Sequence, residues 1–278
     1  MTLTALNENR NSDQNEDSMK KIAVCYKWVL SDEDIRVNEA TRKLDMDKCK
    51  PQINEYDRNG LQCGVLLKHE TGAELMGLTC GPAVAASAKD ALSRGLDAVT
   101  YLEDPAMSEA DATTTSKVLA AMVKQVGGVD AVICSEGSSD EYARQVGPRL
   151  AALLGWPSVS YVSRVAVQGD TLELERKMEE GAEVVSVTGP VVISVVPDVN
   201  DAPIPGVKDI LGAKKKPAIA VSLTDIGLSA EAVKPLTKTV SVLAPVVSRK
   251  NVRLNPDGAG VNDAAAALVK HLSADGVL

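Results

Sequence analysis

A strand–loop–helix pattern in residues 130–157 constrains the fold of this chain more than any other stretch; it reads DAVICSEGSSDEYARQVGPRLAALLGWP. Residues 131–134 are an apolar, β-branched run typical of a buried parallel strand. Small polar residues follow at 135–140 and supply turn conformations and an N-cap at Asp140. Apolar residues then recur at helical spacing, at Val146, Leu150, Leu153 and Leu154. The pattern predicts one βα unit of an open α/β sheet.

The junction in this unit is also a candidate phosphate site. A helix N-terminus offers unpaired backbone N–H groups and a positive dipole end to an anion. Arg144, expected one turn into the helix, adds a charged donor. An ordinary βα connection has the same composition, and the segment is neither a Walker loop nor a GxGxxG motif. Spacing alone therefore leaves both interpretations open.

The rest of the chain repeats the alternation of strand and helix. Further strands are expected at 21–26, 75–80, 97–102 and 191–196, and helices after residue 54 and at 83–94 and 112–126. This order predicts an α/β fold with a doubly wound, mainly parallel sheet of Rossmann-like type. Apolar and polar residues alternate, as in strands, in the segments 159–167, 171–177 and 184–188. This alternation predicts an antiparallel meander added to the sheet.

Composition excludes several functions. The formal net charge of −8 disfavours nucleic acid as a partner. No apolar run approaches the ~18–20 residues of a membrane helix, so no membrane insertion is expected. The 5 cysteines include no CxxC pair and indicate reduced, buried thiols of a cytoplasmic protein. With 2 histidines, neither a metal site nor a hydrolytic triad is expected, and no catalytic residue is assigned.

Residues 130–157 resemble the signature segment of the electron transfer flavoprotein β subunit. In that family a strand runs through an Asp-containing loop into a helix that carries Gln-Thr-Gly or Gln-Val-Gly-Pro. This chain has Gln-Val-Gly-Pro at 145–148 and Leu-Leu-Gly-Trp-Pro at 153–157. The resemblance extends from Met19 to about Pro217 and is closest to the FixA-type branch. It implies an adenine-nucleotide alpha-hydrolase-like fold, an AMP bound in this subunit and an FAD held mainly by an α subunit.

The resemblance also implies which residues meet the nucleotide. Cys25 ends the first strand, and Cys80 belongs to a family-like Cys-Gly-Pro turn. Residues 54–57 resemble the family's Asn-Pro-Phe-Cys/Asp-Glu segment beside the adenosine, and Asn54 is also expected to cap a helix with Asp57 as its capping-box partner. The full expected set is Cys25, Asn54, Glu55, Tyr56, Asp57, Cys80, Ser135, Glu136, Gly137, Ser138, Ser139, Asp140, Glu141, Tyr142, Ala143, Arg144, Gln145 and Val146.

Three segments organise the chain. Residues 1–18 are polar and acidic and are expected to be a disordered tail. Residues 19–217 form the nucleotide-binding domain, and their last part, 198–217, resembles the loop that meets acyl-CoA-dehydrogenase-type flavoenzymes. In that loop Val207, Ile210 and Leu211 are the expected docking residues, beside a solvated Lys214–Lys216 run. Residues 218–278 have too little core to stand alone. By resemblance they form an arm that wraps the α subunit, with exposed Ile226, Leu228, Val240, Val242 and Leu243.

Two alternatives remain. In the first, the pocket holds a second FAD and the complex performs flavin-based electron bifurcation, because Gln145–Pro148 resembles that branch. That branch has Asp-Gly-Asp-Thr, of which only Asp140 is retained here, so AMP or no nucleotide is favoured. The second alternative is an adenine-nucleotide-binding regulatory protein or a nucleotide hydrolase, since such proteins share strand–loop–helix phosphate sites.

Overall fold

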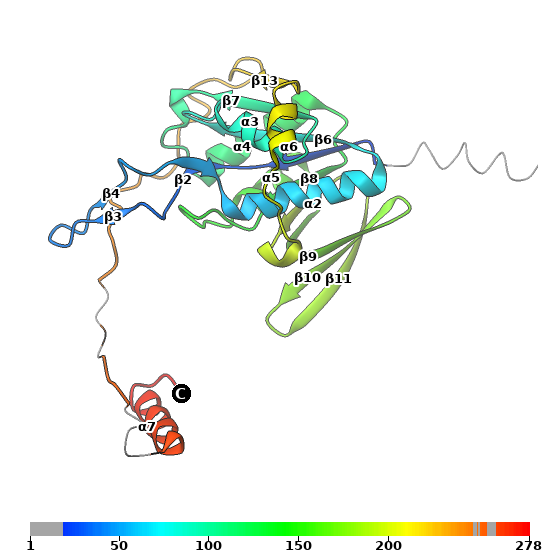
Figure 1. Cartoon of the computed structure of the whole chain (residues 1–278). Coiled ribbons are helices and arrows are strands. Elements are labelled where there is room, and N and C mark those ends of the chain that lie inside the picture. The colour runs from blue at the N-terminus through cyan, green and yellow to red at the C-terminus, as the bar shows by residue number, and fades with distance from the viewer. Residues whose placement is uncertain (1–18, 247–248, 250, 255–259) are drawn as a thin grey trace, which may run out of the picture. The chain divides into compact units, whose positions relative to one another are not determined.

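The computed structural model describes residues 19–246, 249, 251–254 and 260–278. The expectation of a disordered tail falls on residues 1–18, outside the described residues. The described residues divide into two compact units: the larger contains residues 19–36 and 45–241, and the smaller contains residues 37–44 and the described part of 242–278. Figure 1 labels the helices and strands of both.

The larger unit is built on a 9-stranded sheet in the order β11-β10-β9-β12-β8-β1-β6-β7-β13. Strands β12, β8, β1, β6, β7 and β13 run parallel to one another, and β9 joins β12 in parallel. This confirms the predicted α/β fold with a mainly parallel sheet. The strands are β1 (Lys21–Cys25), β6 (Glu74–Gly81), β7 (Ala98–Glu103), β8 (Ala131–Ser135), β12 (Val191–Val195) and β13 (Ala218–Ala220).

Helices cover both faces of this sheet. α2 (Glu55–Thr71) and α3 (Ser87–Ser93) pack on one face, where Leu61, Leu67 and Leu92 join a buried cluster with β1. α4 (Ala112–Val126) and α5 (Val146–Leu154) pack on the other face. α4 has the bounds predicted from sequence, because Asp111 accepts a hydrogen bond from the backbone N–H of Thr114 at 2.9 Å and caps it.

The predicted meander is present at one edge of the sheet. β9 (Ser158–Gln168), β10 (Thr171–Met178) and β11 (Gly181–Thr188) pair antiparallel in sequence order. Figure 1 shows these strands extending from the rest of the sheet. Two short ribbons lie elsewhere: β2 (Trp28–Leu30) with β5 (Pro51–Ile53), and β3 (Arg36–Val37) with β4 (Leu44–Asp45).

The segment 198–217 differs from the loop that the sequence predicts. It contains a 3₁₀ turn, η2 (Pro197–Val199), and a helix, α6 (Val207–Ala213). The carboxylate of Asp209 accepts a hydrogen bond from the N–H of Gly206 at 3.0 Å and stabilises the start of α6. Ala213 is buried in the cluster that holds α3, so tertiary packing completes this short helix.

Residues 218–241 belong to the same unit as the sheet. β13 pairs parallel with β7, so the chain beyond Pro217 adds an edge strand. Leu223, Ile226 and Val233 are then buried in the cluster on the α4 face. The expected exposure of Ile226 is therefore wrong and Leu228 is half-buried, whereas Val240, Val242 and Leu243 are exposed as expected.

The smaller unit contains the last helix, α7 (Val261–Ala274), which has exposed apolar residues at Val261, Leu268 and Val269. An isolated antiparallel bridge joins Lys43 to Leu243 within this unit. No described helix, in either unit, has the length and apolar character needed to span a bilayer.

Candidate nucleotide-binding site

A cavity of about 540 Å³ lies at the carboxyl ends of β1, β6 and β8. Ligands of open α/β sheets bind at this edge, and the volume falls within the roughly 300–1,000 Å³ of small-molecule sites. The register sets Val24 beside Ile133 and Cys25 beside Leu78, which brings the three strand ends together. Three free thiols, of Cys25, Cys80 and Cys134, line the cavity there.

The buried side chain of Asn54 ties the start of α2 to the loop after β8. Its Nδ2 donates to the carbonyl oxygen of Gly137, and its Oδ1 accepts from the N–H of Ser139, both at 3.1 Å. The expected side-chain cap is therefore wrong, although Asn54 does stand at the N-cap position. A buried amide satisfies its polar atoms where partners exist, and here those partners come from the loop rather than from the helix.

Asp57 lies beneath the same loop and does not complete a capping box. Its Oδ2 accepts a hydrogen bond from the backbone N–H of Lys27 at 2.7 Å, and its Oδ1 accepts a short one from the Ser135 hydroxyl. Burial disfavours the charged carboxylate and raises the pKa of Asp57 to about 7, against the opposing hydrogen bond from Lys27. Asp57 therefore connects the ends of β1 and β8 through one buried carboxyl group.

The loop between β8 and α5 is longer than the sequence predicts. α5 begins at Val146, its N-cap position is Gln145, and no side chain caps it. The prediction that Asp140 is the N-cap is therefore wrong. Asp140 instead accepts from the N–H of Glu141 at 2.8 Å and pairs with the ammonium group of Lys27 at 2.7 Å. The extra loop residues place this carboxylate at the cavity rather than at the helix.

Arg144 precedes α5 instead of lying one turn inside it. Its guanidinium carbon lies 4.4 Å from the ring centroid of Tyr142, a cation–π contact. The Tyr142 hydroxyl donates to Glu136 at 2.6 Å, and the Tyr56 ring lies 5.6 Å from that of Tyr142. Both Arg144 (φ 57°) and Tyr142 (φ 47°) have left-handed backbone conformations that are uncommon for such residues. Clusters of this kind are typical of functional loops.

Most of the expected ligand-binding residues meet at this cavity. Asn54, Tyr56, Ser139 and Tyr142 are not among the lining residues; Asn54 and Tyr56 contact the β8–α5 loop at Ser139 and Tyr142. Glu55 lines the second hollow described below instead of this cavity. The expected residues that line the cavity are Cys25, Asp57, Cys80, Ser135, Glu136, Gly137, Ser138, Asp140, Glu141, Ala143, Arg144, Gln145 and Val146.

Lys27 lines the cavity but is not in the set of ligand-binding residues expected from the sequence. Its side chain lines the cavity, and its ammonium group also lies 3.9 Å from the carboxylate of Glu141. One signal for it exists in the sequence, since Lys27 follows the first strand at the edge where open sheets bind ligands.

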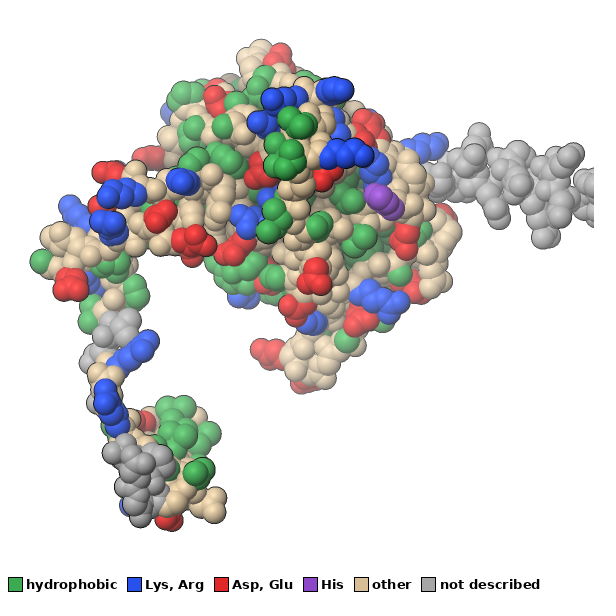
Figure 2. Space-filling model, viewed as in Figure 1, with side chains coloured by type: hydrophobic (Ala, Val, Ile, Leu, Met, Phe, Trp, Pro, Cys, Tyr) green, Lys and Arg blue, Asp and Glu red, His purple; other side chains and the backbone are tan. Residues whose placement is uncertain are grey.

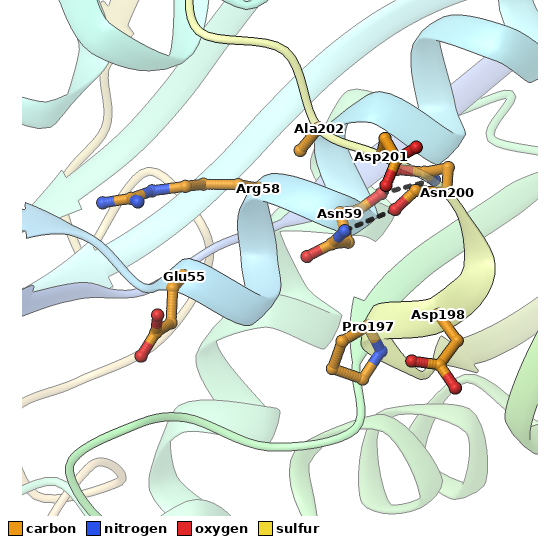
Figure 3. Close-up of a pocket in the computed structure, with 8 residues that line it drawn as sticks. All are labelled: Glu55, Arg58, Asn59, Pro197, Asp198, Asn200, Asp201 and Ala202. Carbon is orange, nitrogen blue, oxygen red and sulfur yellow. Dashed lines mark hydrogen bonds between the residues drawn. The ribbon is translucent and has the colours of Figure 1, made fainter.

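A second hollow, of about 430 Å³, lies between the first turns of α2 and residues 197–202. Figure 3 shows Glu55 and Arg58 there, and two reciprocal hydrogen bonds between Asn59 and Asn200. The Asn59 amide donates to the Asn200 carbonyl at 2.7 Å, and the Asn200 amide donates to the Asn59 carbonyl at 3.0 Å. This pair of hydrogen bonds fastens the segment that leads to α6 onto α2, whose Asp57 lines the first cavity.

The expected docking residues lie on α6. Val207 and Leu211 are 76% and 56% exposed, and Ile210 is 40% exposed. Figure 2 shows apolar side chains between Lys and Arg side chains over this helix, viewed as in Figure 1. Lys216 is not part of a solvated run, because its ammonium group donates to the carbonyls of Leu92 at 3.2 Å and Leu96 at 2.6 Å.

Within the described ranges, no group of His, Cys, Asp and Glu side chains is arranged to hold a metal ion. The family model described as electron transfer flavoprotein domain matches residues 43–226, which include α2, the β8–α5 loop and α6. The chain therefore belongs to the electron transfer flavoprotein family.

Proposed function

We propose that this chain is the β subunit of a heterodimeric electron transfer flavoprotein and that it binds AMP. Its α subunit would hold the FAD, whose isoalloxazine ring carries the electrons. The complex would pass electrons between an acyl-CoA-dehydrogenase-type flavoenzyme and another redox partner. The observation that carries this proposal is the cavity at the ends of β1, β6 and β8, which lies in a chain of this family and is closed by the loop that Asn54 holds.

The residues at the cavity suit a nucleoside monophosphate. The strand ends and Cys25 offer a flat, largely apolar floor for a base, as small-molecule sites commonly do. The first turn of α5 begins at Val146 on the cavity lining and presents backbone N–H groups with no partner inside the helix. Lys27 and Arg144 add positive charge at the same end. AMP in this position would brace the loop rather than react.

The chain's own contribution to electron transfer would be binding and orientation. Val207, Ile210 and Leu211 on α6 would contact the partner flavoenzyme, because exposed apolar residues beside basic ones are typical of docking surfaces. Residues 242–278 would form the arm that contacts the α subunit. No group of this chain is assigned a bond-breaking role, so we describe it as an electron carrier subunit of the cytoplasm rather than an enzyme.

The deciding experiment is to express the chain together with an α subunit and to count the ligands of the purified heterodimer. One flavin and one AMP per heterodimer is the expected result. Two flavins and no AMP would mean that a second FAD, rather than AMP, occupies this cavity, and would indicate a bifurcating complex. An isolated chain that stays monomeric and turns over ATP would instead favour the nucleotide hydrolase alternative.

A further inference from the structure

Lys27 lines the cavity. A hydrogen bond holds its backbone, whereas the ammonium group of its side chain forms an ion pair that can be exchanged for another partner. Its N–H is bound to the buried carboxyl of Asp57 at 2.7 Å, so the residue is held directly after β1. Its side chain is 42% exposed, and its ammonium group pairs with the carboxylate of Asp140 at 2.7 Å. All three residues line the cavity. The backbone position of Lys27 is therefore set by the fold, while the ion pair of its side chain is partly open to solvent.

An ion pair of this kind is easily exchanged. Pairs between exposed side chains contribute only about 0–1 kcal/mol, because water screens both charges. A phosphate group carries more charge than a carboxylate and offers three strong acceptor oxygens. Lysine is a common point-charge ligand of phosphate. A phosphate at the first turn of α5 would thus attract the ammonium group of Lys27 more strongly than Asp140 does.

We propose that Lys27 binds the phosphate of the nucleotide and that Asp140 competes with this phosphate for the same ammonium group. The inference rests on the proposed nucleotide function and adds two roles to it. Lys27 is the cation that distinguishes a nucleotide from a nucleoside. Asp140 lowers nucleotide affinity by occupying that cation, so the cavity releases AMP more readily than it would without this carboxylate.

The test measures the affinity of the heterodimer for AMP and for adenosine by calorimetry, after the bound nucleotide has been removed. Lys27→Gln should weaken AMP binding by roughly 10-fold or more, the scale of a lost charge-assisted hydrogen bond, and leave adenosine binding unchanged. Lys27→Arg keeps the charge and should retain most of the AMP affinity. Lys21→Gln is the matched control, because Lys21 pairs with Glu74 at the opposite end of β1.

Asp140→Asn should strengthen AMP binding several-fold. The double variant Lys27→Gln with Asp140→Asn distinguishes competition for Lys27 from simple charge repulsion as the cause of that gain. If Asp140 competes for Lys27, Asp140→Asn has no effect on AMP binding in the Lys27→Gln background. An equal gain in both backgrounds would show simple charge repulsion and overturn the competition. Equal losses of AMP and adenosine affinity in Lys27→Gln would remove the phosphate role of Lys27. A wild-type complex that binds neither ligand would instead refute the proposed function itself.

Discussion

The side chain of Asn54 accepts a hydrogen bond from the backbone N–H of Ser139 at 3.1 Å, across 85 positions of sequence. This contact joins the start of α2 to the loop beside the cavity at the ends of β1, β6 and β8. The amide nitrogen of Asn54 also donates a hydrogen bond to the Gly137 carbonyl, so the side chain holds the loop at two points. Asn54 itself is fully buried. One buried amide side chain therefore ties two points of this loop to the start of α2.

Asn54→Ala should release this loop. The variant leaves a partly buried carbonyl and a partly buried N–H without their partner, which costs at most about 1–3 kcal/mol of unfolding free energy for each group. AMP retention in the purified heterodimer should fall as well, and urea unfolding measures the stability change. Asn38→Ala is the control, because Asn38 also accepts two backbone N–H bonds, from Ala40 and Thr41, but belongs to the smaller unit and does not line the cavity. Equal AMP loss in both variants would contradict the prediction.

The buried carboxyl of Asp57 should make stability depend on pH. Its folded-state pKa of about 7 lies above the roughly 3.9 of an unfolded chain, so the folded state binds the proton more tightly. Asp57 therefore lowers the free energy of unfolding as pH rises from about 4 to about 7, by at most about 1.4 kcal/mol per pH unit. Above that window its contribution is constant.

Asp57→Asn should remove this slope, which urea unfolding between about pH 5 and about pH 8 would detect. Asp97 is the matched control, since the Lys68 and Leu75 hydrogen bonds outweigh its desolvation and lower its pKa. Asp97→Asn should leave the pH dependence in that window as it is in the wild type. Identical profiles for wild type and Asp57→Asn would show that the Asp57 proton is not taken up on folding.

The exposed apolar residues of α6 should govern encounters with the partner flavoenzyme. Val207→Ala combined with Leu211→Ala should slow electron exchange through weaker docking, because a central apolar anchor commonly carries much of the binding energy. Flavin absorbance and midpoint potential should stay unchanged. Stopped-flow kinetics against the dehydrogenase checks this, and wild-type rates in the double variant would exclude α6 from docking.

Lys214 and Lys215 should affect the association rate with the partner, whereas Lys216 should affect stability. Lys214 and Lys215 are exposed, so replacing both with Gln should lower the association rate mainly at low salt, where the Debye length is greatest. Lys216→Gln should instead lower stability by about 1–3 kcal/mol, because it frees the Leu92 and Leu96 carbonyls that its ammonium group binds. Thermal unfolding and rates at two ionic strengths distinguish them. A salt-dependent rate effect of Lys216→Gln with unchanged stability would refute this assignment.

Truncation should show where the sheet unit ends. A chain that stops after Ser241 keeps β13 and the buried Leu223, Ile226 and Val233, so its sheet unit should stay folded while α-subunit binding is lost. A chain that stops after Pro217 exposes the apolar surface those residues cover, and it should unfold or aggregate. Circular dichroism and co-purification with the α subunit read out both properties. A stable chain ending at 217 would contradict the buried role of residues 218–241.

The sequence by itself determined the order of strands and helices and the class of fold. Hydrophobic periodicity is a local signal, and the apolar residues within 112–126 were enough to predict α4 with its observed bounds. The apolar run at 131–134 and the small residues after it likewise located β8 and its loop. The resemblance at Gln145–Pro148 then indicated the family to which the chain belongs.

Only the tertiary structure decided which side chains serve the cavity. Asn54 and Asp57 have the sequence signature of a helix cap. The Asn54 side chain instead bonds to the loop at 137–139, some 80 positions away, and the Asp57 carboxyl bonds to the ends of β8 and β1. Lys27 and Asp140 meet because parallel strands deliver their ends to one edge. The helix at 207–213 exists because Ala213 packs in the core beside α3. Local patterns carry no information about such partners, since each contact is made only when distant segments pack together.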